Sequence, residues 1–167
     1  ADPLIFGKKA YFNPKTIYRM ARSKAYLFRG VEIRWSCDKK ILKHEDAPPA
    51  KETLHFPGGL VDYLEGTLKN REMLTPFPFA GSTKLSKNSS KVEWAIAWPI
   101  DEANYFNSYC NTVPTPLGGT HENGLRGAIL KGLKNYGELT SNKQALKITA
   151  DDVLGGACVM LSVFFEN

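Results

Sequence analysis

The 167-residue sequence has no long hydrophobic run and contains little cysteine. No apolar stretch approaches the roughly 18–20 residues of a membrane-spanning helix, and the N-terminus lacks the apolar stretch of a secretory signal. The three cysteines, Cys37, Cys110 and Cys158, form no C-x-x-C pair, which argues against a disulfide framework or a zinc knuckle. We therefore expect a cytoplasmic protein with no membrane segment and no bound metal.

Recognisable catalytic and nucleotide-binding motifs are also missing. The glycine loop at residues 116–124 matches neither a P-loop nor a dinucleotide fingerprint, because the glycine spacing is wrong and the lysine is absent. Cys110 and His121 lack a third partner and an oxyanion motif. His44 and His55 have no partner at metal-ligand spacing. The residues by themselves predict no active site.

The composition is that of a folded domain with a mildly basic surface. Apolar residues make up 43% of the chain and charged residues 23%, which are ordinary globular values and exclude wholesale disorder. The net charge is +5 at pH 7, and the basic residues are spread along the chain. This charge permits contact with nucleic acid or with an acidic partner but does not require it.

Capping residues and apolar spacing predict three longer helices and one short one. The longer helices follow Asn13-Pro14, Pro57-Gly58-Gly59 and the loop at residues 114–123. The short helix follows Thr149, whose spacing to Asp152 is that of a capping box. The buried face of the third helix should consist of Leu125, Ala128, Ile129, Leu133 and Tyr136.

Alternating apolar residues predict strands between these helices. The predicted strands are residues 31–35, 53–56, 91–98, 104–113 and 157–165. We expect 104–113 to be the antiparallel neighbour of 91–98, and residues 83–90 to form a hairpin tip. Residues 157–165 are apolar on both faces, which is typical of a central, covered strand. With no linker to divide the chain, the interleaved helices and strands predict one α+β domain.

Gly118 and Gly119 allow two interpretations on the residues alone. Glycines before a helix can bring backbone N–H groups to a phosphate, where the helix dipole favours an anion. The same glycines can be turn residues that need a positive φ.

Four segments carry a family resemblance. They are ARSKAYLFRGVEI at residues 21–33, HFPGGL at 55–60 with the following Tyr63-Leu64, NTVPT through GGTH and GLR at 111–126, and the stretch from Asp151 to Phe165. In this order they resemble the second domain of the ATPase subunits of bacterial type II DNA topoisomerases. The likeness is closer to the B-subunit of topoisomerase IV than to the B-subunit of gyrase, on Pro114-Thr115, VEWA at 92–95 and NGLR at 123–126.

This resemblance implies that residues 1–167 are a transducer domain with a ribosomal protein S5 domain 2-like fold. That fold is an α+β two-layer sandwich, a small mixed sheet with helices on one face. In the whole enzyme such a domain relays ATP binding and hydrolysis to DNA strand passage, which decatenates DNA and relaxes supercoils. The implied cofactors are ATP and Mg²⁺, and the implied partners are double-stranded DNA and the topoisomerase IV A-subunit in an A2B2 assembly at the nucleoid. The ATP-binding and metal-binding cleavage domains would lie outside this chain.

The resemblance also implies roles for particular residues. Arg126, Lys131 and Lys134 on the third helix are the candidates for facing DNA. Gly118, Gly119, Thr120 and His121 are expected to form a conformational loop. No residue is expected to be catalytic or to bind a cofactor, because the family's Gln-Thr-Lys loop would follow Asn167. Two other classes stay open: a free-standing S5-like RNA-binding module, and a small phosphate-handling enzyme that uses the glycine loop.

Overall fold

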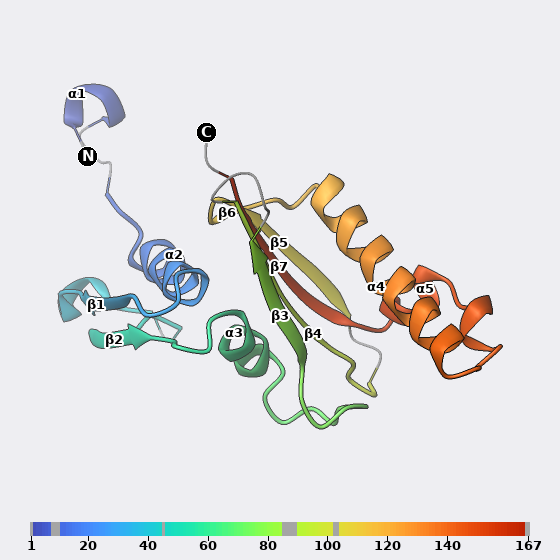
Figure 1. Cartoon of the computed structure of the whole chain (residues 1–167). Coiled ribbons are helices and arrows are strands. Elements are labelled where there is room, and N and C mark those ends of the chain that lie inside the picture. Colours follow the sequence, from blue (N-terminus) through green and yellow to red (C-terminus); the bar gives the residue numbers. More distant parts are fainter. Residues whose placement is uncertain (1, 8–10, 45, 85–89, 102–103, 166–167) are drawn as a thin grey trace. The chain divides into compact units, whose positions relative to one another are not determined.

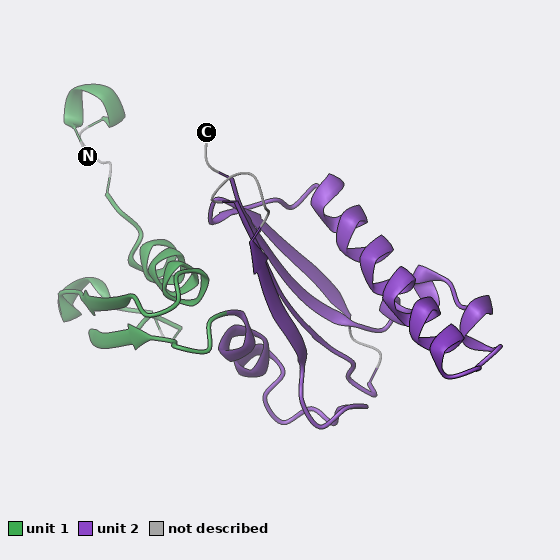
Figure 2. Ribbon diagram, viewed as in Figure 1, with its two compact units in different colours: residues 1–59 green, residues 60–167 purple. Residues whose placement is uncertain are grey.

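The computed structural model describes residues 2–7, 11–44, 46–84, 90–101 and 104–165 (Figure 1). Its contacts divide into two compact units, Ala1–Gly59 and Leu60–Asn167 (Figure 2). That residues 1–167 act as one transducer domain stays a prediction. Among the described residues, no helix combines the length and the apolar character needed to cross a bilayer.

Unit 1 combines helices with a two-stranded sheet. Its elements are α1 (Pro3–Phe6), α2 (Pro14–Leu27), β1 (Glu32–Ser36), the 3₁₀ helix η1 (Lys39–Ile41) and β2 (Lys51–His55). β1 and β2 are antiparallel. The predicted start of α2 is confirmed, because the Asn13 side chain accepts hydrogen bonds from the N–H groups of Lys15 and Thr16. Tyr26 of α2 stacks on Phe56 with 3.6 Å between the ring centroids, which fastens the helix to the end of β2.

Unit 2 is built around a five-stranded mixed sheet. Its strands are β3 (Phe79–Lys84), β4 (Lys91–Ala97), β5 (Tyr105–Cys110), β6 (Val113–Pro114) and β7 (Cys158–Phe164). Their order is β3-β4-β7-β5-β6, and only the β5–β7 pair of this sheet is parallel. β7 is the central, buried strand that its double-sided apolar sequence predicted.

The predicted pairing of residues 104–113 with 91–98 is wrong. β7 lies between β4 and β5 and pairs with both of them. Alternation along a strand shows which side chains share a face, but it carries no information about the neighbouring strand. The most apolar strand takes the centre because only there are both of its faces covered.

A hairpin flanks the predicted tip at residues 83–90. β3 and β4 pair antiparallel up to Lys84 and Lys91. Residues 85–89 of that tip lie outside the described residues.

Gly81 of β3 lies opposite Trp94 of β4. A Cβ on Gly81 would approach the indole to 2.5 Å, so the ring covers the glycine.

In the described part of unit 2, four helical elements accompany the sheet. They are α3 (Leu60–Thr67), α4 (Thr120–Leu139), η2 (Ala145–Lys147) and α5 (Ala150–Leu154). α4 and α5 lie on one side of the sheet and α3 on the other (Figure 1). The core between α4 and the sheet includes Leu125, Ile96 and Val159. The predicted α+β fold with a small mixed sheet is confirmed; its helical layer is α4 and α5, and α3 adds a cover on the opposite face.

Of the five residues predicted for the buried face of α4, two are confirmed. Leu125 and Ile129 pack against the core. Leu133 and Tyr136 continue the same stripe but are 39% and 65% exposed, and Ala128 is exposed as well. The later part of the helix contacts η2 and α5, which are too short to cover the whole stripe.

Candidate functional site

The hairpin β5–β6 leads directly into the glycine loop and α4. Asn111 and Thr112 form its two-residue turn with φ values of 47° and 66°. Two successive positive φ values match a type I′ turn, whose twist suits an antiparallel hairpin. Thr112 is buried, although β-branched residues rarely adopt this conformation.

A chain of polar side chains ties the glycine loop to β5. The buried Ser108 hydroxyl donates to Glu122 Oε1 over 2.5 Å, and Ser108 Oγ lies 2.5 Å from Thr115 Oγ1. Thr115 Oγ1 in turn lies 3.1 Å from His121 Nε2. The two ends of the loop are thereby fastened to one strand, which fixes where α4 begins.

The geometry of the loop favours the turn interpretation of the glycines. Gly118 has a φ of 69°, and its N–H donates to the carbonyl of Thr115 over 2.9 Å. A Cβ on Gly118 would approach Glu122 Oε2 to 3.1 Å. Glu122 already places a carboxylate in the first turn of α4, and this charge opposes a bound phosphate there. Gly119, Thr120 and His121 follow at the start of α4, and the conformational role of all four residues stays a prediction.

The three candidate DNA-facing residues lie along α4. Arg126 is half-buried, with its guanidinium carbon 4.8 Å from the centre of the Phe106 ring on β5. Lys131 is exposed and Lys134 is half-buried. At about 100° per residue, the three side chains leave the helix within an arc of roughly 140°. Arg126 is therefore oriented by the sheet, and the lysines extend the basic surface along the helix.

Sequence reasoning missed the residues that hold this arrangement. Ser108 was not singled out, and Thr115 and Glu122 were noted only as members of the loop segment, although the structure joins all three at the glycine loop. A weak signal was present, because Ser108 lies in a predicted strand that also holds the aromatic residues Tyr105, Phe106 and Tyr109. Only the fold shows that its hydroxyl meets Glu122.

A second polar cluster surrounds the start of β7. Burial raises the pKa of the Cys158 thiol, and the Arg71 guanidinium at 3.8 Å partly opposes this. Burial also raises the pKa of Tyr105, whose hydroxyl lies 2.6 Å from Thr67 Oγ1. A raised pKa keeps Cys158 protonated at neutral pH, which makes it a poor nucleophile. Among the described residues, no group of three His, Cys, Asp or Glu side chains could hold a metal ion.

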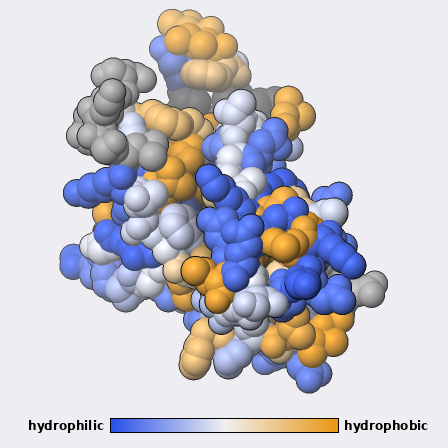
Figure 3. Space-filling model, turned by 45° about the vertical axis from the view of Figure 1, so that its right-hand side comes forward, coloured by the Kyte–Doolittle hydropathy of each residue, from blue (hydrophilic) through white to orange (hydrophobic). Residues whose placement is uncertain are grey.

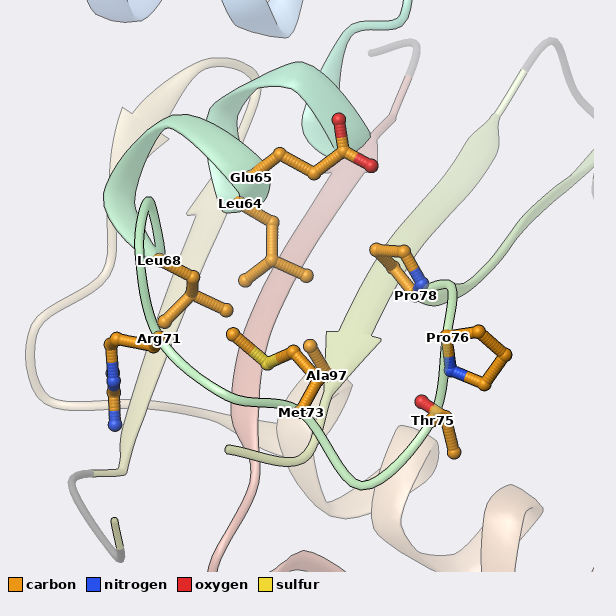
Figure 4. A pocket seen from close by; sticks show the side chains of 9 residues that line it. All are labelled: Leu64, Glu65, Leu68, Arg71, Met73, Thr75, Pro76, Pro78 and Ala97. Atoms are coloured by element: carbon orange, nitrogen blue, oxygen red, sulfur yellow. The ribbon is translucent and has the colours of Figure 1, made fainter. Parts of the chain in front are cut away.

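A small open pocket of about 180 Å³ lies beside α3 (Figure 4). Leu64 and Met73 point toward each other across its apolar floor, while Glu65 points away. Arg71 at its edge binds Asp101. The pocket therefore offers apolar contact but little polar chemistry for orienting a ligand.

The face turned forward in Figure 3 shows apolar and hydrophilic residues in alternating patches. Among the described residues, the exposed apolar side chains at the end of α4 and in η2 are Leu133, Tyr136, Leu139 and Leu146. Apolar side chains are therefore exposed at this end of α4 and in η2.

The model of the DNA gyrase B family matches residues 59–167, which is more than half of the chain. The chain belongs to the DNA gyrase B family. The match starts at the boundary between the two units, so unit 2 is the part that this family model describes. The family resemblance inferred from the four sequence segments is confirmed.

Curated relatives in the gyrase B family extend the similarity to the whole chain. The DNA topoisomerase 4 B-subunit of Bartonella bacilliformis is 52% identical over 166 residues, and that of Rickettsia conorii is 49% identical over 167 residues. The alignments cover 99% of this chain but only 24% and 25% of those proteins. The DNA gyrase B-subunit of Chlamydia muridarum is 27% identical over 170 residues. The chain thus spans about a quarter of the length of the topoisomerase 4 relatives.

Solved structures support the gyrase B family fold. The 43K ATPase domain of Thermus thermophilus gyrase B, in complex with an aminocoumarin, matches 99% of this chain and 43% of its own, with a TM-score of 0.75 and 25% identity. The topoisomerase IV ATP binding domain of Francisella tularensis matches 96% of this chain and 40% of its own, with a TM-score of 0.72 and 29% identity.

Proposed function

We propose that the chain is the transducer segment of a topoisomerase IV B-subunit. In this role it relays ATP binding and hydrolysis to DNA strand passage by the whole enzyme. The observation that carries the proposal is the difference in identity between two groups of relatives. The topoisomerase 4 relatives are 46–52% identical to it, whereas the gyrase relative from Chlamydia muridarum is 27% identical.

The proposal places the chain in a larger assembly. The whole protein would use ATP and Mg²⁺, bound outside residues 1–167, and would act with the topoisomerase IV A-subunit in an A2B2 enzyme. Its substrate would be double-stranded DNA at the bacterial nucleoid in the cytoplasm. We assign no catalytic residue to this chain, and its contribution is mechanical: it connects a DNA-contacting surface to the parts that bind nucleotide.

The DNA-contacting surface that we propose is the basic side of α4. Arg126, Lys131 and Lys134 can each neutralise a phosphate, and phosphate contacts position a duplex without reading its sequence. The Phe106 ring holds the Arg126 guanidinium in place, which lowers the entropy lost when this side chain binds. Motion of α4 would be passed to β5 through Ser108 and Glu122.

The test is DNA binding by the chain with a labelled duplex of about 20 base pairs, measured by fluorescence anisotropy at several salt concentrations. We expect weak binding that is independent of sequence and that fades with salt. The variants Arg126→Ala, Lys131→Ala and Lys134→Ala should each weaken binding and lower the salt slope by about 1.

The matched control is Lys69→Ala. Lys69 is exposed just after α3, which lies on the opposite side of the sheet from α4, so the variant removes the same charge elsewhere. It should bind DNA like the wild type. If Lys69→Ala and the α4 variants lose equal amounts of DNA affinity, the proposed surface is contradicted. A clear preference for one DNA sequence would contradict it too.

A further inference from the structure

The turn between β5 and β6 holds the end of β7 through the side chain of Asn111. Asn111 Oδ1 accepts a hydrogen bond from the N–H of Phe165 over 2.9 Å, and Asn111 Nδ2 donates to the carbonyl of Phe165 over 3.2 Å. The backbone N–H of Asn111 donates to the carbonyl of Val163 over 2.9 Å. The regular pairing of β5 with β7 ends at Cys110 and Val163. The amide side chain therefore adds a further step of pairing to Phe165.

We call the two hydrogen bonds between the Asn111 side chain and the Phe165 backbone the Asn111 clamp. This clamp needs an asparagine for two separate reasons. Asn111 has a φ of 47°, a conformation that asparagine and glycine adopt more readily than other residues. Its amide group also supplies one donor and one acceptor to the same backbone residue. Glycine would fit the φ but make neither bond, and aspartate would supply acceptors only.

The other end of the same hairpin holds the start of α4. Ser108 on β5 and Thr115 after β6 bind Glu122 and His121 in the first turn of that helix. One short hairpin thus touches both the start of α4 and the last described residue after β7. A shift of α4 that moved the hairpin would also shift Phe165.

We propose that Asn111 is a positioning residue that fixes the position of Phe165 at the end of β7 and couples that position to the start of α4. The clamp itself requires no DNA or nucleotide. The inference rests on the proposed function in one respect, namely that the coupling serves the relay between DNA and ATP.

The first experiment measures amide hydrogen exchange in the 167-residue chain by NMR. The Phe165 amide should be protected in the wild type, and Asn111→Gly should speed its exchange at least tenfold. Asn111→Asp keeps an acceptor for this N–H and should restore most of the protection. The amide of Ile96 in the buried β4 reports whether each variant is still folded.

The control is Asn70→Gly. Asn70 also has a positive φ, at 68°, but it lies after α3, and its substitution should leave Phe165 unchanged. Unchanged protection of Phe165 in Asn111→Gly would overturn the proposal. Equal losses in Asn111→Gly, Asn111→Asp and Asn70→Gly would overturn it too, because the effect would then be a general loosening.

The second experiment measures ATP hydrolysis by the full-length protein in complex with the topoisomerase IV A-subunit, with and without duplex DNA. Asn111→Gly should reduce the stimulation by DNA several-fold without changing the KM for ATP, Asn111→Asp should recover part of it, and Asn70→Gly should match the wild type. In a contrary outcome, DNA would stimulate ATP hydrolysis by Asn111→Gly as strongly as in the wild type although the Phe165 amide exchanges faster. That result would show that the clamp is structural only, which overturns the coupling. A wild-type enzyme without any DNA stimulation would instead contradict the proposed function and leave the exchange result standing.

Discussion

At the scale of single residues, Thr149 and Asp152 complete each other's hydrogen bonds at the start of α5. The Thr149 side chain accepts from the N–H of Asp152, and the Asp152 carboxylate accepts from the Thr149 hydroxyl and backbone N–H over 2.7 and 2.8 Å. These are the bonds of a capping box, so the box predicted from the spacing is confirmed. The donors hold the pKa of the Asp152 carboxyl below its usual value, with the Thr149 hydroxyl as the main cause.

Because of this lowered pKa, the contribution of Asp152 to folding stability depends on pH in a known direction. A carboxyl group with a lower pKa in the folded state adds stability above its unfolded pKa of about 3.9 and loses it as the pH falls through the folded value. We expect Asp152→Asn to lower the urea midpoint at pH 7 and to lower it much less at about pH 3. Asp151→Asn, in the same first turn but outside the capping box, is the control. A loss that is equal at both pH values would contradict this account.

At the scale of elements, two of the four glycines of α4, Gly132 and Gly137, have very different surroundings. A Cβ on Gly137 would lie 2.3 Å from the Cβ of Ala145, so the glycine allows η2 to pack directly against the helix. A Cβ on Gly132 would meet nothing within 4 Å. Glycine inside a helix lowers stability by about 0.5–1 kcal/mol relative to alanine. Of these two glycines, only Gly137 offsets this loss, because it allows close packing.

The two glycines make a matched test of that packing. Gly132→Ala should raise the free energy of unfolding by about 0.5–1 kcal/mol. Gly137→Ala should lower it by about 1–3 kcal/mol, because the new methyl group overpacks the contact with η2. Urea denaturation of both variants measures the difference. A stabilising Gly137→Ala would mean that η2 is not held against α4 in solution.

The α4 glycines also show how far the sequence alone could be interpreted. Apolar spacing identified the helix and the buried Leu125 and Ile129, because the face of a helix is a local property. Spacing could not show that Tyr136 is 65% exposed, since this depends on how much of the helix η2 and α5 cover. Gly137 likewise looked like any other glycine until η2 was found against it.

At the scale of the whole molecule, unit 2 has a hydrophobic core of its own. Residues from α4, α5, β4 and β7 form it, and its buried members are Ile96, Leu125, Leu154, Ala157, Val159, Leu161 and Val163. The family model also covers this unit and starts at residue 59. A sheet with covered faces and a core drawn from several elements meets the requirement for an independent folding unit.

We therefore expect residues 60–167 to fold without residues 1–59. The shorter chain should unfold in one cooperative urea transition, followed by the fluorescence of Trp94 and Trp98. The full chain, in which Trp35 reports on unit 1, is the comparison. A broad transition without cooperativity for residues 60–167 would contradict the prediction and show that the two units depend on each other.

Local sequence determined the caps of α2 and α5, the alternating face of β4 and the two-sided burial of β7, because each depends on neighbours a few residues away. It also contained the four segments that identified the family. The order of the strands, the cover that α3 adds to the second face, the Ser108–Glu122 contact and the Asn111 clamp were decided only by the tertiary structure. Each of these joins segments far apart in the chain, and the partner is selected by shared burial and by hydrogen bonds that exist only once the whole sheet has formed.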